Sequence, residues 1–353
     1  MNRVLIFTLC CLCLLGMAPP CAAQSQDSLA QMIRFYEDDD FINIWFKGSD
    51  DAYTNGTRID YFYKPAHPSH LFLDSWMPRA GAGSTDIYGW GAMQIMYTPD
   101  DISDADYQPN DYPWSGALIA THTRYSYNPE KQYDLQTELV LGVIGPAALS
   151  RQTQTLVHRV ENYYKPMGWE HQFSNDLLLN VNVTAEKQLA SIGSAIQIIG
   201  CGQLFAGTMQ NGAALYPMII IGRMNPYFQG LFSQFASPGR KNGRRQSQLY
   251  FFAKPELQWY LSNALLQGGP FTTNPNLAVT KAKTAAASTA QDTTNTSPPQ
   301  PYHLLQTWVP SFTYGVNASM GHWGISFSQI ISAATLRGLY CHNYGNLSLY
   351  YSW

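Results

Sequence analysis

Charged side chains are scarce in this sequence. Asp, Glu, Lys and Arg make up 13% of its 353 residues, which is about half the usual share in a soluble domain. Acidic and basic residues nearly balance and leave a net charge of −3. Without a basic excess the chain lacks the attraction for phosphates that nucleic-acid binding requires, so we expect no nucleic-acid partner.

Cysteine and long apolar runs are scarce as well. Four of the six cysteines fall within the first 21 residues, and only Cys201 and Cys341 lie beyond them. These two are too few and too distant to predict a zinc site. An exported protein could join them in a disulfide, although nothing in the sequence requires it.

The one long apolar run lies close to the N-terminus. It follows Arg3, extends from Val4 to Met17, and leads into small residues that end at Ala23. This order predicts a secretory signal peptide, residues 1–23, removed after Ala23. The run is too short to span a membrane comfortably, and no later segment approaches that length.

Aromatic residues are abundant, at 14% of the chain, with 23 Tyr and 9 Trp. A chain that is weakly charged, not continuously apolar and rich in Tyr and Trp suits a transmembrane β-barrel with aromatic girdles. Composition alone also allows a soluble exported β-sandwich.

Alternation of apolar and polar residues separates these two folds. One segment interleaves Leu, Val and Ala at 179, 181, 183 and 185 with Asn and Thr between them. In other alternating segments the polar positions include Arg58, Asp60 and Glu138. Such charges are expensive inside a sandwich core, whereas a polar barrel lumen accepts them. The final segment alternates in the same way and ends on the aromatic Trp353. A last strand that ends on an aromatic residue resembles the C-termini of outer-membrane barrels.

The fold class that we predict is therefore all-β, a transmembrane antiparallel β-barrel of about 12 strands in one domain, residues 24–353. The candidate strands lie near 30–38, 53–65, 89–99, 116–128, 133–145, 174–188, 196–210, 213–224, 246–263, 307–319, 322–333 and 346–353. With a periplasmic N-terminus, the extracellular connections are 39–52, 100–115, 146–173, 211–212, 264–306 and 334–345. The connection 264–306 includes a low-complexity tract that lacks apolar residues to order it.

One extracellular connection contains a predicted short helix. The run from Ser150 to Tyr163 lacks Gly and Pro, and it follows a strand that Gly145 and Pro146 end. Gln154 and His158 are four residues apart and share one face of this helix. A single histidine on a polar helix is also typical of an ordinary surface residue. Ser150 is a poor nucleophile candidate because no Gly-x-Ser-x-Gly turn surrounds it.

A run of carboxylates at 37–40 precedes the connection between the first two predicted strands. Adjacent carboxylates repel unless a cation neutralises them, and oxygen ligands suit calcium or magnesium. A solvated acidic loop is the alternative. Thr54 has the strand parity of Arg58 and Asp60, which places it near this run.

Several short motifs in order carry a family resemblance. They are Asp39 with Phe41, Tyr53-Thr54-Asn55-Gly56, Tyr97-Thr98-Pro99, Asp111 with Pro113 and Gly116, Gly142 to Pro146, Gln154 with His158-Arg159, and Gly168-Trp169 with Gln172. This set resembles the outer-membrane lipid A 3'-O-deacylase family. The match spans most of the chain after residue 23 and weakens after about residue 175.

The resemblance implies a calcium-dependent esterase that removes the 3'-linked acyloxyacyl chain of lipid A. In that family a histidine activates water, and bound Ca²⁺ polarises the ester carbonyl. Carried over, the catalytic residues are His158 as general base, Gln154, Asp39 and Thr54, and the metal ligands are Asp38 and Asp39. The substrate-binding positions are Tyr112 and Arg159.

The resemblance also implies the partner and the location. We expect an integral protein of the bacterial outer membrane, a monomer, acting on lipopolysaccharide in the outer leaflet. The chain departs from the family pattern at three positions: Asp38 replaces Asn, Tyr112 replaces a basic residue, and Tyr164 replaces an acid. These departures keep two alternatives open: a non-catalytic barrel that serves as a pore or surface scaffold, and an outer-membrane phospholipase.

Overall fold

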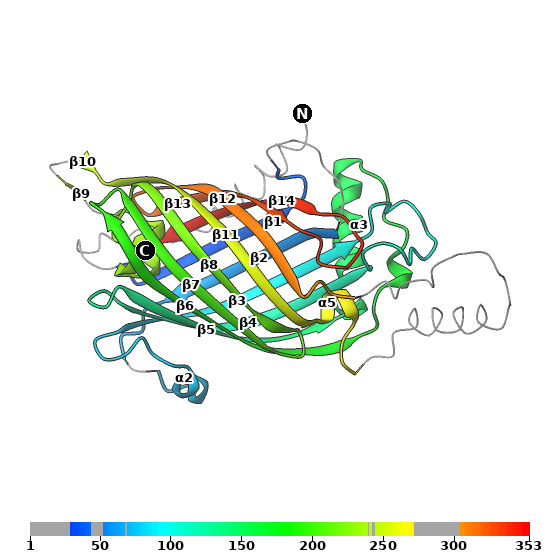
Figure 1. The fold of residues 1–353 in the computed structure, drawn as a ribbon, viewed down its shortest axis with the longest axis horizontal. Helices are drawn as coiled ribbons and strands as arrows, with labels where there is room; N and C mark the ends of the chain where they lie inside the picture. The colour runs from blue at the N-terminus through cyan, green and yellow to red at the C-terminus, as the bar shows by residue number, and fades with distance from the viewer. Residues whose placement is uncertain (1–28, 44–51, 68, 239, 242–243, 272–303) are drawn as a thin grey trace.

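Twelve antiparallel strands close into a single barrel in the computed structural model (Figure 1). The structure describes residues 29–43, 52–67, 69–238, 240–241, 244–271 and 304–353. The barrel strands are β1 Gln31–Asp39, β2 Ala52–Tyr63, β3 Thr85–Thr98, β4 Ser115–Asn128, β5 Tyr133–Ile144, β6 Asp176–Ile192, β7 Ile196–Gly207, β8 Gln210–Arg223, β11 Ser247–Asn263, β12 Trp308–Met320, β13 Trp323–Ser332 and β14 His342–Ser352. Each strand pairs with its neighbour in the chain, and β1 pairs with β14 to close the ring. The predicted barrel and its strand number are confirmed.

Short helices and one small sheet occupy the connections. They are α2 Phe72–Trp76, α3 Ser150–Glu161, α4 Leu231–Phe235, α5 Ala264–Gln267, the 3₁₀ turns η1 Pro146–Ala148, η2 Trp169–His171 and η3 Tyr227–Gln229, and the pair β9 Arg240–Lys241 with β10 Arg244–Arg245. Within the described ranges, no helix combines the length and apolar character needed to cross a membrane.

The two ends of the barrel carry different elements (Figure 1). Helices α3 and α5 lie at one end, in two of the connections predicted to be extracellular, while α2 and the β9–β10 pair lie at the other. Bacterial barrels have their longer loops outside the cell, so we assign the α3 end to the extracellular face and the opposite end to the periplasm. The predicted signal peptide, residues 1–23, and most of the connection 264–306 lie outside the described residues.

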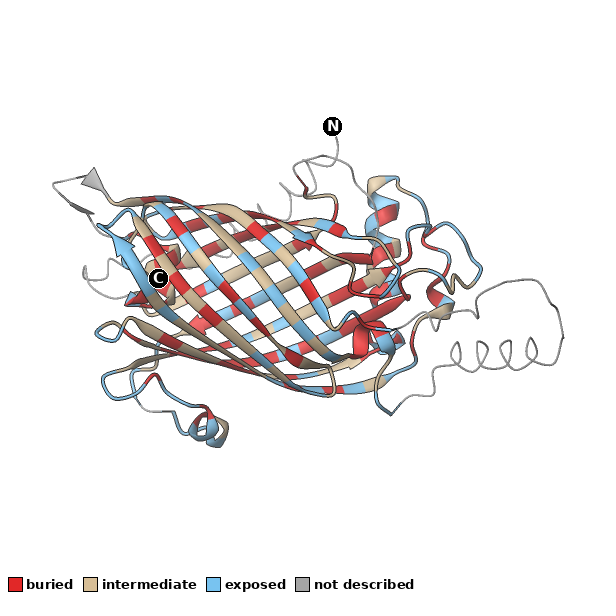
Figure 2. Ribbon diagram, viewed as in Figure 1, coloured by how far each residue is buried: buried red, intermediate tan, exposed pale blue. Residues whose placement is uncertain are grey.

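The outer wall presents apolar side chains at alternate strand positions. Figure 2 shows that exposed residues recur along the strands. Its exposed members include Ile59, Leu118, Leu141, Leu179, Val181, Leu204, Leu215, Leu249, Phe251 and Ile325. Aromatic rings gather where the wall meets the periplasmic end. Tyr61 lies 6.3 Å from Trp353, and Trp353 lies 5.7 Å from Tyr351, between ring centroids. This is the aromatic girdle of a membrane barrel.

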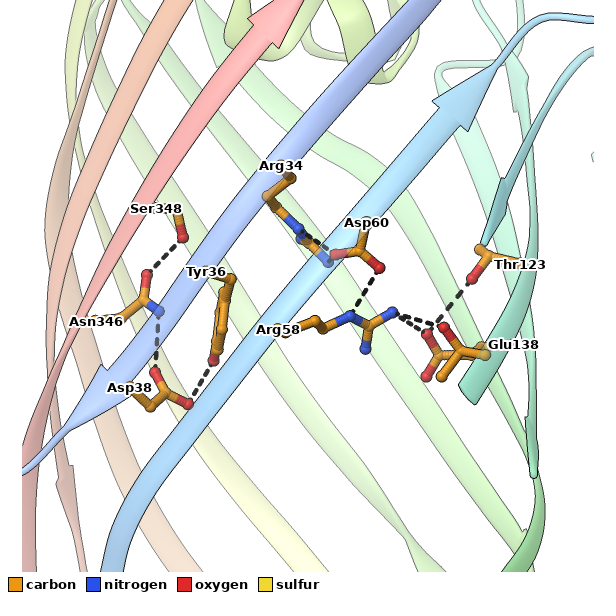
Figure 3. Close-up of polar contacts among 10 residues, drawn as sticks. Arg34, Tyr36, Asp38, Arg58, Asp60, Thr123, Glu138, Asn346 and Ser348 are labelled. Carbon is orange, nitrogen blue, oxygen red and sulfur yellow. Dashed lines mark hydrogen bonds and ion pairs between the residues drawn. The ribbon is translucent and has the colours of Figure 1, made fainter. Parts of the chain in front are cut away.

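The lumen contains a chain of ion pairs (Figure 3). Asp60 accepts from Arg34 at 2.7 Å and from Arg58 at 2.8 Å, and Arg58 reaches Glu138 of β5, beyond strands β3 and β4, at 2.5 Å. Thr123 and Asn182 also donate to the Glu138 carboxylate. The charges that alternation assigned to the lumen thus neutralise one another there, which is how buried charges are tolerated.

Helix α4 enters the periplasmic mouth of the barrel. Gln234 donates to the Tyr125 hydroxyl at 3.2 Å, and Phe235 stacks on the Tyr350 ring with centroids 3.9 Å apart. Next to it lies a lumen cavity of about 510 Å³, whose lining includes nine tyrosines. The two described cysteines are free: Cys201 is buried and Cys341 is exposed.

Candidate functional site at the extracellular rim

Helix α3 lies against the outside of the barrel wall, not over its lumen. Gly145 turns the chain at a φ of 97° after β5, and η1 leads directly into the helix. The helix ends at Asn162, whose left-handed backbone lets its N–H bond to the carbonyls of Arg159 and His158. Its buried side chains recur every four residues, at Ser150, Gln154 and His158, so one face meets the wall. The predicted helix is confirmed.

Small residues and hydrogen bonds hold this helix close to strands β3 and β4. A Cβ on Gly116 would lie 2.2 Å from the Ser150 hydroxyl, so only glycine allows this approach. Gln94 Nε2 donates to the carbonyl of Ala148 at 2.6 Å. Below the helix, Met96, Ile102, Trp114 and Trp169 form a buried cluster, against which Tyr163 packs. The helix is therefore packed closely against the wall.

His158 is buried on the wall-facing side of α3, with a relative exposure of 5%. Its Nδ1 lies 2.6 Å from the backbone carbonyl oxygen of Tyr164. A carbonyl only accepts, so Nδ1 carries the proton, and Nε2 of the neutral ring has the basic lone pair. The ring also packs edge-on against Tyr163 at 5.1 Å. Both contacts fix the orientation that a general base requires.

Gln154 lies one helical turn before His158 and is equally buried. Trp169 Nε1 donates to its Oε1 at 2.6 Å, which fixes the amide so that Nε2 points away from Trp169. Within the described part of the chain, Gln154 Nε2 has no protein acceptor. The same holds for one side-chain atom in each of three nearby residues, Trp114 Nε1, Ser150 Oγ and Gln172 Oε1. The interface between α3 and the wall thus has hydrogen-bonding capacity that the protein itself does not use.

Asp38 and Asp39 point to opposite sides of β1, as successive residues of a strand do. Asp38 faces the lumen, where its carboxylate accepts from Tyr36 at 2.6 Å and Asn346 at 3.0 Å (Figure 3). It also accepts from Tyr53 at 2.9 Å. Asp39 lies on the outer side, where it accepts from the Phe41 N–H at 2.7 Å and from Asn55 at 3.4 Å. The structure does not bring these two carboxylates together.

Thr54 does not follow the parity of Arg58 and Asp60, and that expectation is wrong. The pairing of β2 with β3 shifts register between Tyr53 and Asn55, which makes Thr54 the extra residue of a β-bulge. Tyr53 therefore takes the lumen side, and Thr54 hydrogen-bonds to the hydroxyl of Thr98 at 2.8 Å. The bulge moves Thr54 to the outer side of the wall, the side that Asp39 occupies.

Tyr163 connects the acidic segment with the helix. Its ring lies 5.4 Å from Phe41, two residues beyond Asp39, and 5.1 Å from the His158 ring. The connection after β3 joins this assembly, because Met167 N–H donates to the carbonyl of Ile102 at 2.8 Å. Three of the predicted extracellular connections therefore meet on one outer face, which carries His158, Gln154 and the end of β1.

The two predicted substrate-binding residues occupy different settings. Arg159 is exposed on α3. Tyr112 is fully buried; its hydroxyl accepts from the Thr335 N–H and donates to the Tyr340 carbonyl, both at 3.3 Å. Burial raises the pKa of Tyr112, so the hydroxyl stays protonated and keeps this donation. In this arrangement Tyr112 joins two extracellular connections, with no hydroxyl left at the surface for a substrate phosphate.

The implied calcium site fits the structure only in part. A hard cation needs several oxygen ligands on one side. Asp38 cannot share an ion with Asp39, because it faces the lumen and all its bonds go to neutral donors there. Asp39 instead shares its face with Glu37, and Asn55 donates to both. Among the described residues, no three His, Cys, Asp or Glu side chains gather as a metal site.

Two contributors to the site were not assigned from the sequence, Trp169 and Tyr163. Trp169 belongs to a Gly-Trp motif of the family resemblance, but its hydrogen bond to Gln154 spans fifteen residues of chain. Tyr163 follows the helix directly and resembles an ordinary interface aromatic. Neither role has a local signal, because each depends on how the connection folds back on the wall.

A sequence profile of the family described as outer membrane protein LpxR matches residues 6–353. The chain belongs to the LpxR family. This confirms the resemblance that the motifs carry, and it supports a place in the outer membrane as an integral barrel. A search of the curated proteins finds no significant match.

Solved structures add a likeness in fold. LpxR from Salmonella typhimurium superposes with a TM-score of 0.64 at 14% sequence identity, over 91% of this chain and 100% of that chain. The β domain of the Bordetella autotransporter BrkA gives a TM-score of 0.41 at 8% identity, over 93% and 100%. At these identities the first likeness speaks for the fold alone, and the second is too weak to support an argument.

Proposed function

We propose that this protein is an outer-membrane lipid A deacylase that hydrolyses the ester of the 3'-linked acyloxyacyl chain. The observation that carries the proposal is the buried His158, oriented by the Tyr164 carbonyl on the membrane-facing side of the wall. Membership in the LpxR family supports it. A lipid of the outer leaflet can reach this face laterally, without entering the lumen.

In the proposed reaction, His158 Nε2 takes a proton from water as the water attacks the ester carbonyl. The carbonyl of Tyr164 holds the imidazole and stabilises the imidazolium through Nδ1–H. The departing alkoxide on the sugar then takes the proton back from Nε2, which restores the neutral ring. Gln154 Nε2, fixed through Trp169, is the amide donor available to a developing oxyanion.

Calcium dependence remains a prediction of the resemblance. When bound, the ion would polarise the ester carbonyl. Of the two predicted ligands, only Asp39 lies on the His158 side of the wall, so the proposal retains Asp39 and assigns Asp38 to the lumen.

The lumen favours hydrolysis at the rim over transport through the barrel. Helix α4 occupies the periplasmic mouth, and the ion pairs of Arg58 bridge β2 to β5. A pore would need a continuous path past both features.

The test is to express the chain in a bacterium with hexa-acylated lipid A and to analyse extracted lipids by mass spectrometry. We expect loss of the 3'-linked acyloxyacyl chain relative to an empty vector. Heat-modifiable gel mobility shows whether the barrel is folded. A folded barrel with unchanged lipid A would refute the proposal. Lysophospholipids in place of shortened lipid A would reassign the site to a phospholipase.

A further inference from the structure

The outer wall of β4 changes character along its length. At the extracellular half its outward side chains are the exposed Leu118 and Ala120, as expected for a lipid-facing surface. The next four outward positions toward the periplasm are polar and buried: His122, Arg124, Ser126 and Asn128. Polar groups on a lipid-facing wall are costly unless other groups satisfy them.

A segment of the β2–β3 connection covers all four positions. We call residues 71–84 the outer strap. Asp74 Oδ1 lies 2.6 Å from His122 Nε2, and Arg124 donates to the carbonyls of Asp74 at 2.7 Å and Met77 at 2.8 Å. Further along, the Ala80 N–H donates to Ser126 at 3.0 Å, and Asn128 donates to the Ala80 carbonyl at 3.2 Å. The strap is therefore a fixed part of the wall.

The opposite side of the strap is apolar and faces away from the protein. Helix α2 turns Asp74 inward, while Phe72 and Trp76, four residues apart, share its outer face. Trp76 is 84% exposed and Phe72 is 68% exposed. Figures 1 and 2 show α2 standing beside the periplasmic end of the barrel, with exposed surface on its outer side.

The surroundings indicate what covers these two rings. The strap lies next to the aromatic girdle: Tyr63 is 6.1 Å from Tyr88, and the exposed Trp90 packs 4.2 Å from His122. Cationic groups lie beside it as well, because the Arg79 side chain is 55% exposed and the exposed Lys131 approaches Gly81. Aromatic rings with nearby cations are typical of the headgroup level of a membrane.

We propose that the outer strap is a lipid-binding surface for the periplasmic leaflet, with Phe72 and Trp76 inserted at the boundary between phospholipid headgroups and acyl chains. Arg79 and Lys131 then lie at the level of the phosphates. The hydrogen bond between Asp74 and His122 and the bonds of Arg124 set the height of α2 on the wall. This surface is separate from the rim that carries His158.

Spin labels on neighbouring positions of α2 test the proposal. Single cysteines replace Trp76, Phe72, Ser75 or, as a control in the β4–β5 turn, Glu130, in the full chain carrying Cys341→Ser. The parent with Cys341→Ser alone gives the background labelling. The proteins are reconstituted in vesicles of phosphatidylethanolamine and phosphatidylglycerol. Collision rates with oxygen and with a polar nickel chelate then report depth.

We expect the oxygen-to-nickel ratio at Trp76→Cys and Phe72→Cys to exceed that at Ser75→Cys and Glu130→Cys several-fold. Because Ser75 and Trp76 are adjacent, a difference between them reports which side of α2 meets the lipid and not the height of the whole strap. Equal ratios at 75 and 76 in a folded barrel would overturn the proposal. Protection of position 76 from both reagents would also overturn it, since that result means a protein partner covers the ring.

Discussion

The lumen and the outer rim of this barrel use polar residues in opposite ways. In the lumen, Arg58, Asp60 and Glu138 bond to one another, and Asp38 accepts three hydrogen bonds from neutral donors. Under α3, by contrast, Gln154 and Ser150 keep polar atoms without protein partners in the described structure. The difference separates groups that hold the barrel together from groups whose hydrogen-bonding capacity the protein leaves unused.

This contrast predicts a clean separation of mutant effects. Substitutions in the lumen should lower the free energy of unfolding and leave turnover by the folded protein unchanged. Substitutions under α3 should instead lower turnover while the barrel still folds. Each variant below therefore needs two measurements, lipid A deacylation in membranes and unfolding by urea in lipid vesicles.

The largest effect is expected at His158. The His158→Ala variant should lower deacylation by about 10²- to 10⁴-fold, because general-base catalysis contributes that much. The barrel should still fold, because His158 lies in an extracellular connection and not in one of the twelve strands. Arg151→Ala, an exposed change on the same helix, is the matched control and should retain full activity. An active His158→Ala protein would remove the histidine from the mechanism.

Breaking the lumen ion chain should have the opposite signature. The Arg58→Met variant leaves Glu138 without its cationic partner, so we expect about 3 kcal/mol lower stability. Adding Glu138→Gln should restore part of this loss, because no buried charge is then left unpaired. Deacylation per folded molecule should be unchanged. A selective loss of turnover would show that the lumen takes part in catalysis.

The two adjacent carboxylates sharpen the comparison further. Asp39→Asn should lower deacylation by about 10- to 100-fold, the range seen when groups around a metal are changed. Asp38→Asn should lower stability instead, because it disturbs the bonds from Tyr36, Tyr53 and Asn346. A calcium chelator should reduce the parent's activity, and added calcium should restore it. If Asp38→Asn lowered deacylation and Asp39→Asn lowered stability, the cation would lie in the lumen.

The smallest effect is expected at Tyr112. Tyr112→Phe removes the hydroxyl that joins Thr335 to the Tyr340 carbonyl, so stability should fall by about 1 kcal/mol. The KM for lipid A should not change, because the hydroxyl is buried. A raised KM with unchanged stability would support the substrate-binding role that the family resemblance implies.

The strand number could be predicted because apolar and polar residues alternate within each of the twelve segments. This alternation is local to each strand and does not depend on its neighbours. Helix α3 was predictable for a similar reason, as an uninterrupted run after Pro146. Asp38 was harder to place, since its side of the wall depends on counting from the correct strand position. Thr54 was assigned to the wrong side of the wall because the alternation pattern does not reveal the extra residue of a β-bulge.

The outer strap went unpredicted, although β4 contains a trace of it. From Thr121 to Ser126 the strand is polar on both faces, which neither a lumen nor a lipid contact explains. A strand of a membrane barrel that is polar on both sides requires a cover from elsewhere in the chain. The identity of that cover, the β2–β3 connection, becomes visible only in three dimensions.

The bulge at Thr54 means that a change of chain length, not of residue type, decides which side of the wall a side chain serves. Because the extra residue lies near the extracellular end of β2, the strand toward the periplasm keeps its pairing and its ion pairs. Without the extra residue, Thr54 would keep the parity of Arg58 and Asp60 and face the lumen. Relatives of this protein that differ by a single insertion or deletion at this point would therefore present different side chains on each side of the wall, even where the flanking residues are the same.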